Sequence, residues 1–169
     1  MQEKFTIGLL VSNHFGVLNR VAGLYSKRGY NIDSLAVGET ENPEYSRMTI
    51  VSTGDEYMKE QVVKQLQKLH DVKQVSLFDQ SSMVSNEHML IKLLADSEQT
   101  AKISDFINTY GGKVMDFGSD FITAEITGES KKVEEFLKGA AGFGILETCR
   151  SGAISMVHGT ENMLSVKNL

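Results

Sequence analysis

The sequence of 169 residues contains one cysteine, one proline and no tryptophan. A single cysteine, Cys149, excludes a disulfide within the chain and is typical of a reducing cytoplasm. No apolar run approaches the roughly 20 residues that a helix needs to cross a membrane. The first residues also lack the basic and apolar segments of a signal peptide. We therefore expect a cytoplasmic globular protein.

The sequence also has no excess of basic residues. Seventeen lysines and arginines stand against 22 aspartates and glutamates, which gives a net charge of −5. Residues 1–78 are balanced in charge, so the acidic excess lies in residues 79–169. Because neither half offers a basic face for a phosphate backbone, nucleic-acid binding is not expected.

Metal-binding and catalytic patterns are absent from the sequence. Four histidines are spread along the chain: His14, His70, His88 and His158. None of them stands at metal-ligand spacing from another histidine or from Cys149. A glycine-rich run, 139–144, follows a helical pattern and precedes a strand pattern, the reverse of a dinucleotide-binding loop. We interpret it as a loop, and we predict neither a catalytic residue nor a metal site.

What the sequence does contain is a pattern of strands and helices that occurs twice. Alternating apolar residues predict strands, and apolar residues three and four apart predict helices. In the first half the order is strand, helix, strand, strand, helix, strand: 5–11, 16–28, 32–37, 47–52, 55–69 and 72–78. In the second half the same order recurs at 89–95, 103–110, 113–117, 121–126, 129–138 and 145–151. The tail from Gly152 shows no regular pattern.

This repetition predicts an α+β fold of two tandem ferredoxin-like βαββαβ units, each an antiparallel sheet with both helices on one face. The polar run 79–82 is the best linker, which places the domains at 1–78 and 79–169. Each sheet would leave one face and its edges uncovered, and soluble proteins usually pair or cover such edges. Two such sheets could join edge to edge, within the chain or between chains, so a homodimer is expected on physical grounds.

The first strand runs into the segment Asn13-His14-Phe15-Gly16-Val17-Leu18, where a helix begins. The first amides of a helix have no partner within the helix and favour an anion. Glycine at position 16 permits a close approach and unusual dihedral angles. We call the backbone amides of Gly16, Val17 and Leu18 the anion seat, and it suits the carboxylate of a small molecule.

Three blocks of sequence carry a resemblance to a known family. They are residues 13–18, then Arg28-Gly29-Tyr30-Asn31-Ile32-Asp33-Ser34-Leu35, then Ser46-Arg47-Met48-Thr49-Ile50. Together they closely resemble the regulatory small subunit of acetolactate synthase, also called acetohydroxyacid synthase. Residues 5–78 resemble an amino-acid-binding ACT domain. The second half resembles the C-terminal domain of that family, with Arg150-Ser151-Gly152 as its best-matching segment.

The resemblance implies a protein without an active site of its own. Such a subunit binds a thiamine-diphosphate-dependent catalytic large subunit and raises its activity. It also confers feedback inhibition by a branched-chain amino acid, most often valine, in the biosynthesis of valine, leucine and isoleucine. Thiamine diphosphate, Mg²⁺ and FAD would belong to the catalytic partner.

The resemblance also implies an effector site between two ACT domains. Asn13 would hold the ligand by its side-chain amide, and the anion seat would bind its carboxylate. From the neighbouring protomer, Asn31 would offer its carbonyl to the ammonium and Ile32 would line the side-chain pocket. The bulky Phe15 departs from many ACT domains, which have proline or a small residue there, so it bears on which amino acid is sensed.

Other interpretations of these residues remain open at the level of sequence. Asn13 could cap the first helix, and Arg47 could be a solvated edge charge or a contact to the catalytic subunit. His14 could tune affinity with pH or simply face solvent, and Cys149 is expected to be a structural thiol. Three methionines stand at core spacing: Met48, Met58 and Met89.

Three other functions compete with a regulatory subunit. A stand-alone tandem ACT sensor could regulate transcription or another enzyme. An RNA-binding βαββαβ module would need aromatic residues on its open sheet, and the strand 47–52 has none. A small enzyme on this scaffold would need converging acid, base or nucleophile residues, which the sequence does not reveal.

Overall fold

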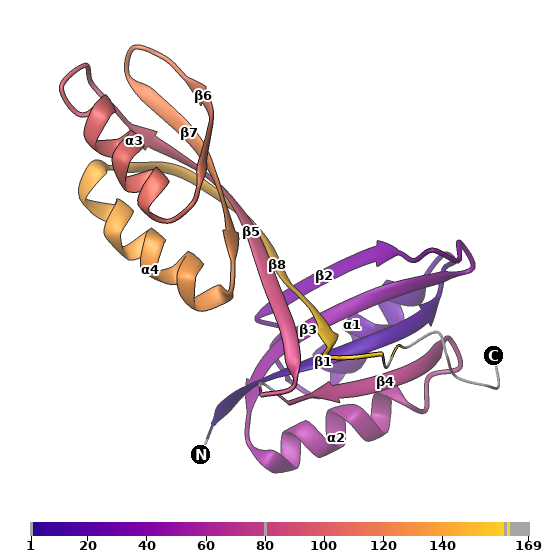
Figure 1. The fold of residues 1–169 in the computed structure, drawn as a ribbon. Coiled ribbons are helices and arrows are strands. Elements are labelled where there is room, and N and C mark those ends of the chain that lie inside the picture. The colour runs from indigo at the N-terminus through magenta and orange to yellow at the C-terminus, as the bar shows by residue number, and fades with distance from the viewer. Residues whose placement is uncertain (1, 80, 161, 163–169) are drawn as a thin grey trace. The chain divides into compact units, whose positions relative to one another are not determined.

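The computed structural model describes residues 2–79, 81–160 and 162, and contains the βαββαβ order twice (Figure 1). The first repeat comprises β1 (Glu3–Ser12), α1 (Val17–Lys27), β2 (Ser34–Glu39), β3 (Tyr45–Gly54), α2 (Glu56–Leu66) and β4 (Val72–Phe78). The second comprises β5 (Met83–Leu94), α3 (Thr100–Thr109), β6 (Lys113–Phe117), β7 (Phe121–Gly128), α4 (Ser130–Ala140), the 3-10 helix η1 (Ala141–Phe143) and β8 (Ile145–Val157).

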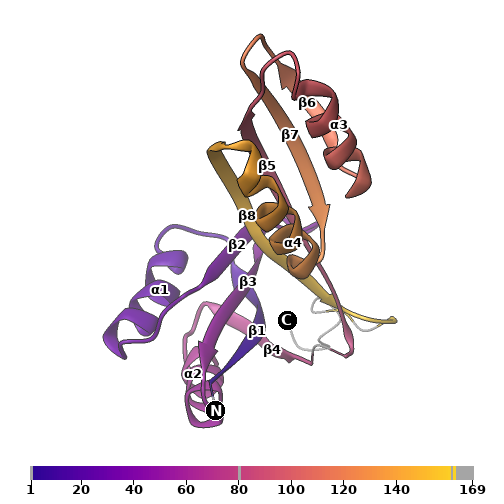
Figure 2. The same ribbon diagram turned by 90° about the vertical axis from the view of Figure 1, so that its left-hand side faces the viewer.

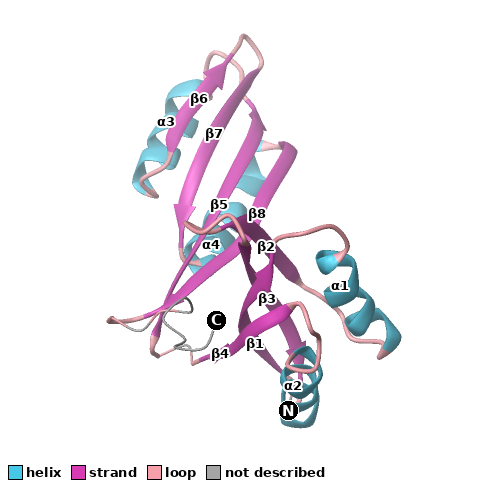
Figure 3. Ribbon diagram, turned by 90° about the vertical axis from the view of Figure 1, so that its right-hand side faces the viewer, coloured by secondary structure: helices cyan, strands magenta, loops and turns pink. Residues whose placement is uncertain are grey.

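The first sheet has the order β2-β3-β1-β4, and its neighbouring strands run antiparallel. Figure 3 shows α1 and α2 on one side of this sheet. The core lies between the sheet and the helices, where alternate residues of β1 meet Val21 and Tyr25 of α1 and Val62 of α2. Burial of apolar side chains on one face explains why the alternating strand pattern and the helical pattern were both visible in the sequence.

The second sheet has the order β6-β7-β5-β8. Figures 1 and 2 show α3 and α4 next to one another on one face of it. An aromatic cluster fills part of this core, with ring centroids 4.9 Å apart between Phe106 and Phe136 and 5.3 Å apart between Phe106 and Phe143. The predicted α+β fold, two ferredoxin-like units with antiparallel sheets and helices on one face, is confirmed.

By packing, the chain divides into two compact units. One contains the residues up to Val84 together with the described residues from Ile154 onward, and the other contains Ser85–Ala153. The predicted domains 1–78 and 79–169 follow the sequence repeat instead, so they count the end of β8 with the second half. None of the described helices is long and apolar enough to cross a membrane.

Two predictions about local structure are wrong. The glycine-rich run 139–144 is not a loop, because α4 continues through Gly139 to Ala140 and η1 follows. Phe106 packs so closely on Gly139 that an added Cβ would lie 2.7 Å from its ring. The final strand also extends from the predicted end at 151 to Val157. Of the predicted tail, residues 161 and 163–169 lie outside the described residues.

Arg47 lies in the first unit and is half-buried rather than solvated. Its guanidinium covers the ring of Phe78, 5.6 Å from the centroid, and its Nη2 donates a hydrogen bond to the carbonyl oxygen of Ser155 at 2.8 Å. Burial lowers the pKa of Arg47. Arg47 therefore attaches the end of β8 to the sheet of the first unit. The methionines behave as predicted: Met48 and Met89 are buried, and Met58 packs against the first core.

Candidate functional site

The turn between β1 and α1 leaves the first amides of α1 open. Gly16, at the start of the helix, has φ +87° and ψ −8°, a left-handed conformation that favours glycine. No side chain caps this helix and its first turn contains no acidic residue. The N–H of Arg20 donates to the oxygen of Gly16 at 3.1 Å, whereas the N–H of Val17 reaches only the oxygen of His14 at 3.5 Å. The local geometry can therefore accept an anion.

The corresponding turn of the second repeat is filled by the chain itself. There the carboxylate of Asp96 accepts hydrogen bonds from the N–H groups of Glu98 at 3.0 Å and Gln99 at 2.8 Å. The main-chain oxygen of Asp96 also accepts from the N–H of Thr100 at 3.0 Å. In the second repeat, therefore, an internal carboxylate binds the amides of the turn before α3, although no side chain caps α3 itself.

Asn13 does not cap α1, so that interpretation of the sequence is wrong. Its side-chain Nδ2 donates to Oε2 of Glu39 at 3.0 Å and to the carbonyl oxygen of Pro43 at 2.9 Å. Its Oδ1 accepts from the hydroxyl of Ser46 at 3.0 Å. Asn13 thus joins the turn before α1 to the hairpin formed by β2 and β3.

A second group of contacts holds the same turn from the side of β4. Asp71 is 5% exposed, and its carboxylate is contacted by Arg20 Nη1, by His14 Nε2 at 3.1 Å and by His70 Nδ1 at 3.6 Å. Burial raises the pKa of Asp71, but the hydrogen bond and charge of Arg20, with His70 and the charge of His14, outweigh it and hold the pKa below its usual value. The main-chain oxygen of Asp71 accepts from the N–H of Ser12 at 2.8 Å.

Sequence reasoning missed Asp71, which lies 51 residues from Arg20 and 57 from His14. The only signal was an aspartate next to a histidine directly before a predicted strand. His14 is half-exposed yet bonded to Asp71, so it is more than a solvent-facing turn residue. Cys149 lies in β8 as predicted, but it is exposed rather than packed.

Asn31 and Ile32 lie at the other end of α1. Asn31 Nδ2 donates to Oδ1 of Asp33 at 2.6 Å, and Ile32 is half-buried against the first core. The 11 residues of α1 separate these two residues from the anion seat. At about 1.5 Å per residue, the helix is about 16 Å long. Within one chain, therefore, the structure does not bring the two sets of predicted site residues together.

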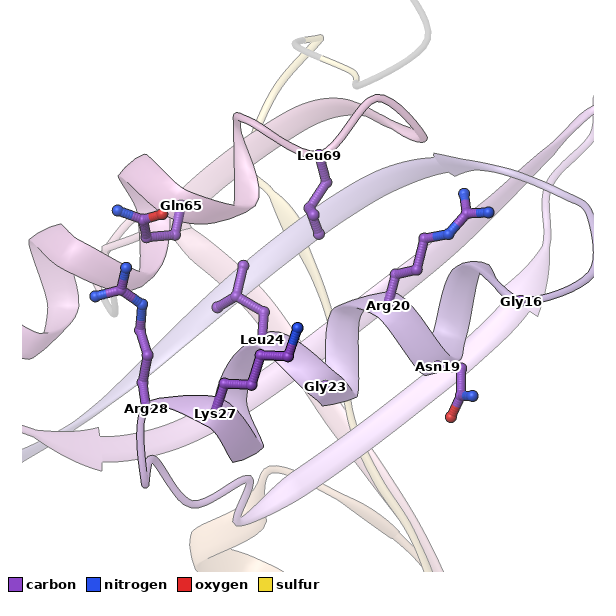
Figure 4. A pocket seen from close by; sticks show the side chains of 9 residues that line it. All are labelled: Gly16, Asn19, Arg20, Gly23, Leu24, Lys27, Arg28, Gln65 and Leu69. Carbon is purple, nitrogen blue, oxygen red and sulfur yellow. The ribbon is translucent and has the colours of Figure 1, made fainter.

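Between α1 and α2 runs a groove that begins at Gly16 (Figure 4). It is lined by Gly16, Asn19, Arg20, Gly23, Leu24, Lys27, Arg28, Gln65 and Leu69. Figure 4 shows Asn19 pointing away from Arg20 across the helix. The lining contains three cationic side chains and no acidic one: Arg20 contacts Asp71, and Lys27 and Arg28 lie at the end of α1. Within the part of the chain that the structure describes, no three histidine, cysteine, aspartate or glutamate residues form a possible metal site.

The fold and the open turn define a protein of the ACT class, with two ACT-like modules in tandem. Residues 7–74 match the family described as the AHAS small subunit-like ACT domain, and residues 86–159 match the family described as the small subunit of acetolactate synthase. Together these matches cover most of the chain.

Individual relatives agree with this assignment. The acetolactate synthase small subunit of Mycolicibacterium smegmatis is 39% identical over 162 residues, covering 96% of this chain and 95% of the relative. The acetolactate synthase isozyme 3 small subunit of Salmonella typhimurium is 38% identical over 158 residues, covering 93% of this chain and 97% of the relative. The crystal structure of the acetolactate synthase small subunit from Thermotoga maritima matches this structure with a TM-score of 0.86 at 34% identity. The match covers 94% of this chain and 99% of that chain. The chain belongs to the family of acetolactate synthase small subunits.

Proposed function

We propose that this chain binds the catalytic large subunit of acetolactate synthase, raises its activity and makes it sensitive to a branched-chain amino acid, valine foremost. Thiamine diphosphate, Mg²⁺ and FAD would be held by the large subunit, and the complex would work in the cytoplasm. The observation that carries the proposal is the division of the predicted effector site between the two ends of α1. A regulatory site of this kind needs a second copy of the chain to be complete.

Two copies of α1 packed antiparallel would place the start of one helix beside the end of the other. The amides of Gly16, Val17 and Leu18 would then bind the effector's carboxylate, with the side-chain amide of Asn13 next to them. From the partner protomer, the carbonyl of Asn31 would accept from the ammonium group and Ile32 would contact the aliphatic side chain. The left-handed Gly16 and the uncapped start of α1 support this arrangement.

A site that is divided in this way couples the ligand to the dimer. The effector can shift an equilibrium only by its difference in affinity for the two states. If one arrangement of the two protomers brings the half-sites together and another does not, the effector favours the first. Any difference between these arrangements in their effect on the large subunit then appears as feedback.

Calorimetric titration of the chain with valine, leucine and isoleucine tests the proposal, both alone and in complex with the large subunit. We expect saturable binding of one amino acid, lost in Asn13→Ala. The matched control is Asn108→Ala, which removes the same side chain from an exposed position of α3. Absence of binding to the chain and to the complex, together with no inhibition of the complex, would contradict the proposal.

A further inference from the structure

Glu39 accepts a hydrogen bond from the side-chain amide of Asn13, the group that would hold the effector. It is the last residue of β2, and its Oε2 accepts a hydrogen bond from Nδ2 of Asn13 at 3.0 Å. The other acceptor of Nδ2 is the carbonyl oxygen of Pro43 at 2.9 Å. An asparagine side chain has two N–H donors, so both donors of Asn13 are engaged within the chain.

The position of Glu39 follows from the register of the hairpin. Glu39 lies opposite Ser46 across the ladder of β2 and β3, and Ser46 donates its hydroxyl to Oδ1 of Asn13 at 3.0 Å. Glu39 and Ser46 therefore bind the nitrogen and the oxygen of the same side-chain amide, that of Asn13. This geometry fixes the orientation of Asn13 and directs one of its N–H groups at a carboxylate.

That carboxylate is chemically the same group as the one an amino acid would present. The inference rests on the proposed function, in which the Asn13 amide holds the effector. We infer that Glu39 is an internal competitor, which takes one N–H of Asn13 until the effector's carboxylate displaces it. Glu39 thereby sets the effector concentration at which the site fills.

The hydrogen bond between Asn13 and Glu39 is of a kind that a ligand can replace. The side chains of Asn13 and Glu39 are both exposed, so water competes for the bond and it contributes little net free energy. Pro43 presents a main-chain oxygen held by the hairpin, whereas Glu39 can rotate away. The charge of Glu39 also repels a second carboxylate nearby. Both effects reduce the apparent affinity, which equals the intrinsic affinity multiplied by the fraction of molecules with a free amide.

Titration of the complex with valine, leucine and isoleucine tests the inference in wild type, Glu39→Ala, Glu39→Gln and Glu41→Gln. We expect Glu39→Ala to bind the effector about threefold to tenfold more tightly. Glu39→Gln should be intermediate, because glutamine is neutral but can still accept from Asn13. Glu41→Gln removes the same charge from the same hairpin at an exposed position, and should bind as the wild type does.

The results separate this inference from the proposed function. If the wild type binds and the Glu39 variants bind equally or more weakly, the competitor role is wrong while the effector site stands. Equal tightening in Glu41→Gln would show a general charge effect and would also overturn the role. If no variant binds any of the three amino acids, the proposed function fails and this inference fails with it.

A measurement without effector completes the test. In the free chain, the side-chain amide resonances of Asn13 should shift in Glu39→Ala and stay in place in Glu41→Gln. Unchanged Asn13 resonances in Glu39→Ala would show that the two side chains are not bonded in solution, and would overturn the inference.

Discussion

The two repeats have the same topology but differ at the turn between their first strand and first helix. In the first repeat the helix begins at the left-handed Gly16, with no side-chain cap and no acid in its first turn. In the second repeat the carboxylate of Asp96 accepts hydrogen bonds from the N–H groups of Glu98 and Gln99. One turn is left open, and the other contains its own anion.

This difference shows that the fold alone does not decide which turn contains an internal carboxylate. A ferredoxin-like unit supplies a helix start behind its first strand in both repeats, and helix starts favour anions. In the second repeat the carboxylate of Asp96 binds two amides of the turn before the helix. In the first repeat no side chain caps the start of α1, and contacts of Asn13, His14 and Arg20 hold the turn before it.

The largest effect is expected when the first repeat is made to resemble the second. Gly16→Asp places a carboxylate at the anion seat, where it repels the effector's own. We expect the effector affinity to fall about 100-fold or more, since juxtaposed like charges cost several kcal/mol. Activation of the large subunit should survive. Inhibition assays on the reconstituted complex measure both effects.

The matched control for that change is Gly16→Asn. Asparagine has the same size as aspartate and tolerates the left-handed region, but it carries no charge. Nothing lies within 4 Å of a Cβ built at Gly16, so neither variant creates a clash. Gly16→Asn should retain most of the affinity. Full inhibition of Gly16→Asp at wild-type effector concentrations would show that the helix start does not bind the effector.

A smaller effect is expected from loosening the turn without adding a charge to it. Asp71→Asn removes the carboxylate that Arg20, His14 and His70 contact. We expect weaker effector binding and a lower urea midpoint, whereas Asp116→Asn, at an exposed position of β6, should change neither. An unchanged affinity in Asp71→Asn would show that these contacts do not position the turn.

The same variant should alter the dependence of stability on pH. Because the folded-state pKa of Asp71 is lowered, its contribution is complete above the unfolded pKa of about 3.9 and is lost as pH falls through the folded value. The wild type should therefore lose its advantage over Asp71→Asn as the pH drops below about 4. Parallel urea midpoints from pH 7 to pH 3 would contradict the role of Asp71 as a stabilising carboxylate.

The smallest effect on effector affinity is expected when the carboxylate of Asp96 is removed from the second repeat. Asp96→Ala removes the carboxylate that binds the amides of Glu98 and Gln99 in the turn before α3, and should cost about 1 kcal/mol of stability, measured by urea unfolding. Asp96→Ser, which keeps an oxygen that can accept from these amides, should recover most of it. Effector affinity should stay at the wild-type value in both variants. A loss of affinity comparable to that of Gly16→Asp would mean that the second repeat, too, takes part in binding.

Much of the fold could be predicted because its signals are local. The strand expected at 72–78 is the observed β4, and α1 and α3 end before Gly29 and Gly111, which have positive φ values. The second strand was expected at 32–37 but lies at Ser34–Glu39. Asp33 explains part of this shift, because its carboxylate accepts from Asn31 and from the hydroxyl of Thr53 just before the strand.

The errors occurred where packing outweighs local preference. A glycine in a helix costs about 1 kcal/mol, yet α4 continues through Gly139 because Phe106 packs on it and Phe136 and Ala140 are buried. In the last part of β8 the small residues Ala153 and Ser155 face inward while Ile154 and Met156 are exposed. This reverses the usual apolar alternation, so the strand was not visible in the sequence.

The candidate site could be predicted only in part from the sequence, for a similar reason. The open start of α1 follows from a glycine beside a strand end, which is local information. The contacts of Asn13 with Glu39 and of His14 with Asp71 join residues that are 26 and 57 positions apart. No spacing rule reveals such pairs, because they depend on the order of strands in the folded sheet.

The central claim is that each effector site takes its anion seat from one protomer and Asn31 from the other. Mixing two defective chains, Gly16→Asp and Asn31→Ala, tests this claim directly by calorimetry after the subunits have exchanged. Neither variant alone should bind the effector. In a two-fold dimer each mixed pair would regain one intact site, so about a quarter of all sites should bind with wild-type affinity. No recovery on mixing, or wild-type binding by Asn31→Ala alone, would contradict the divided site.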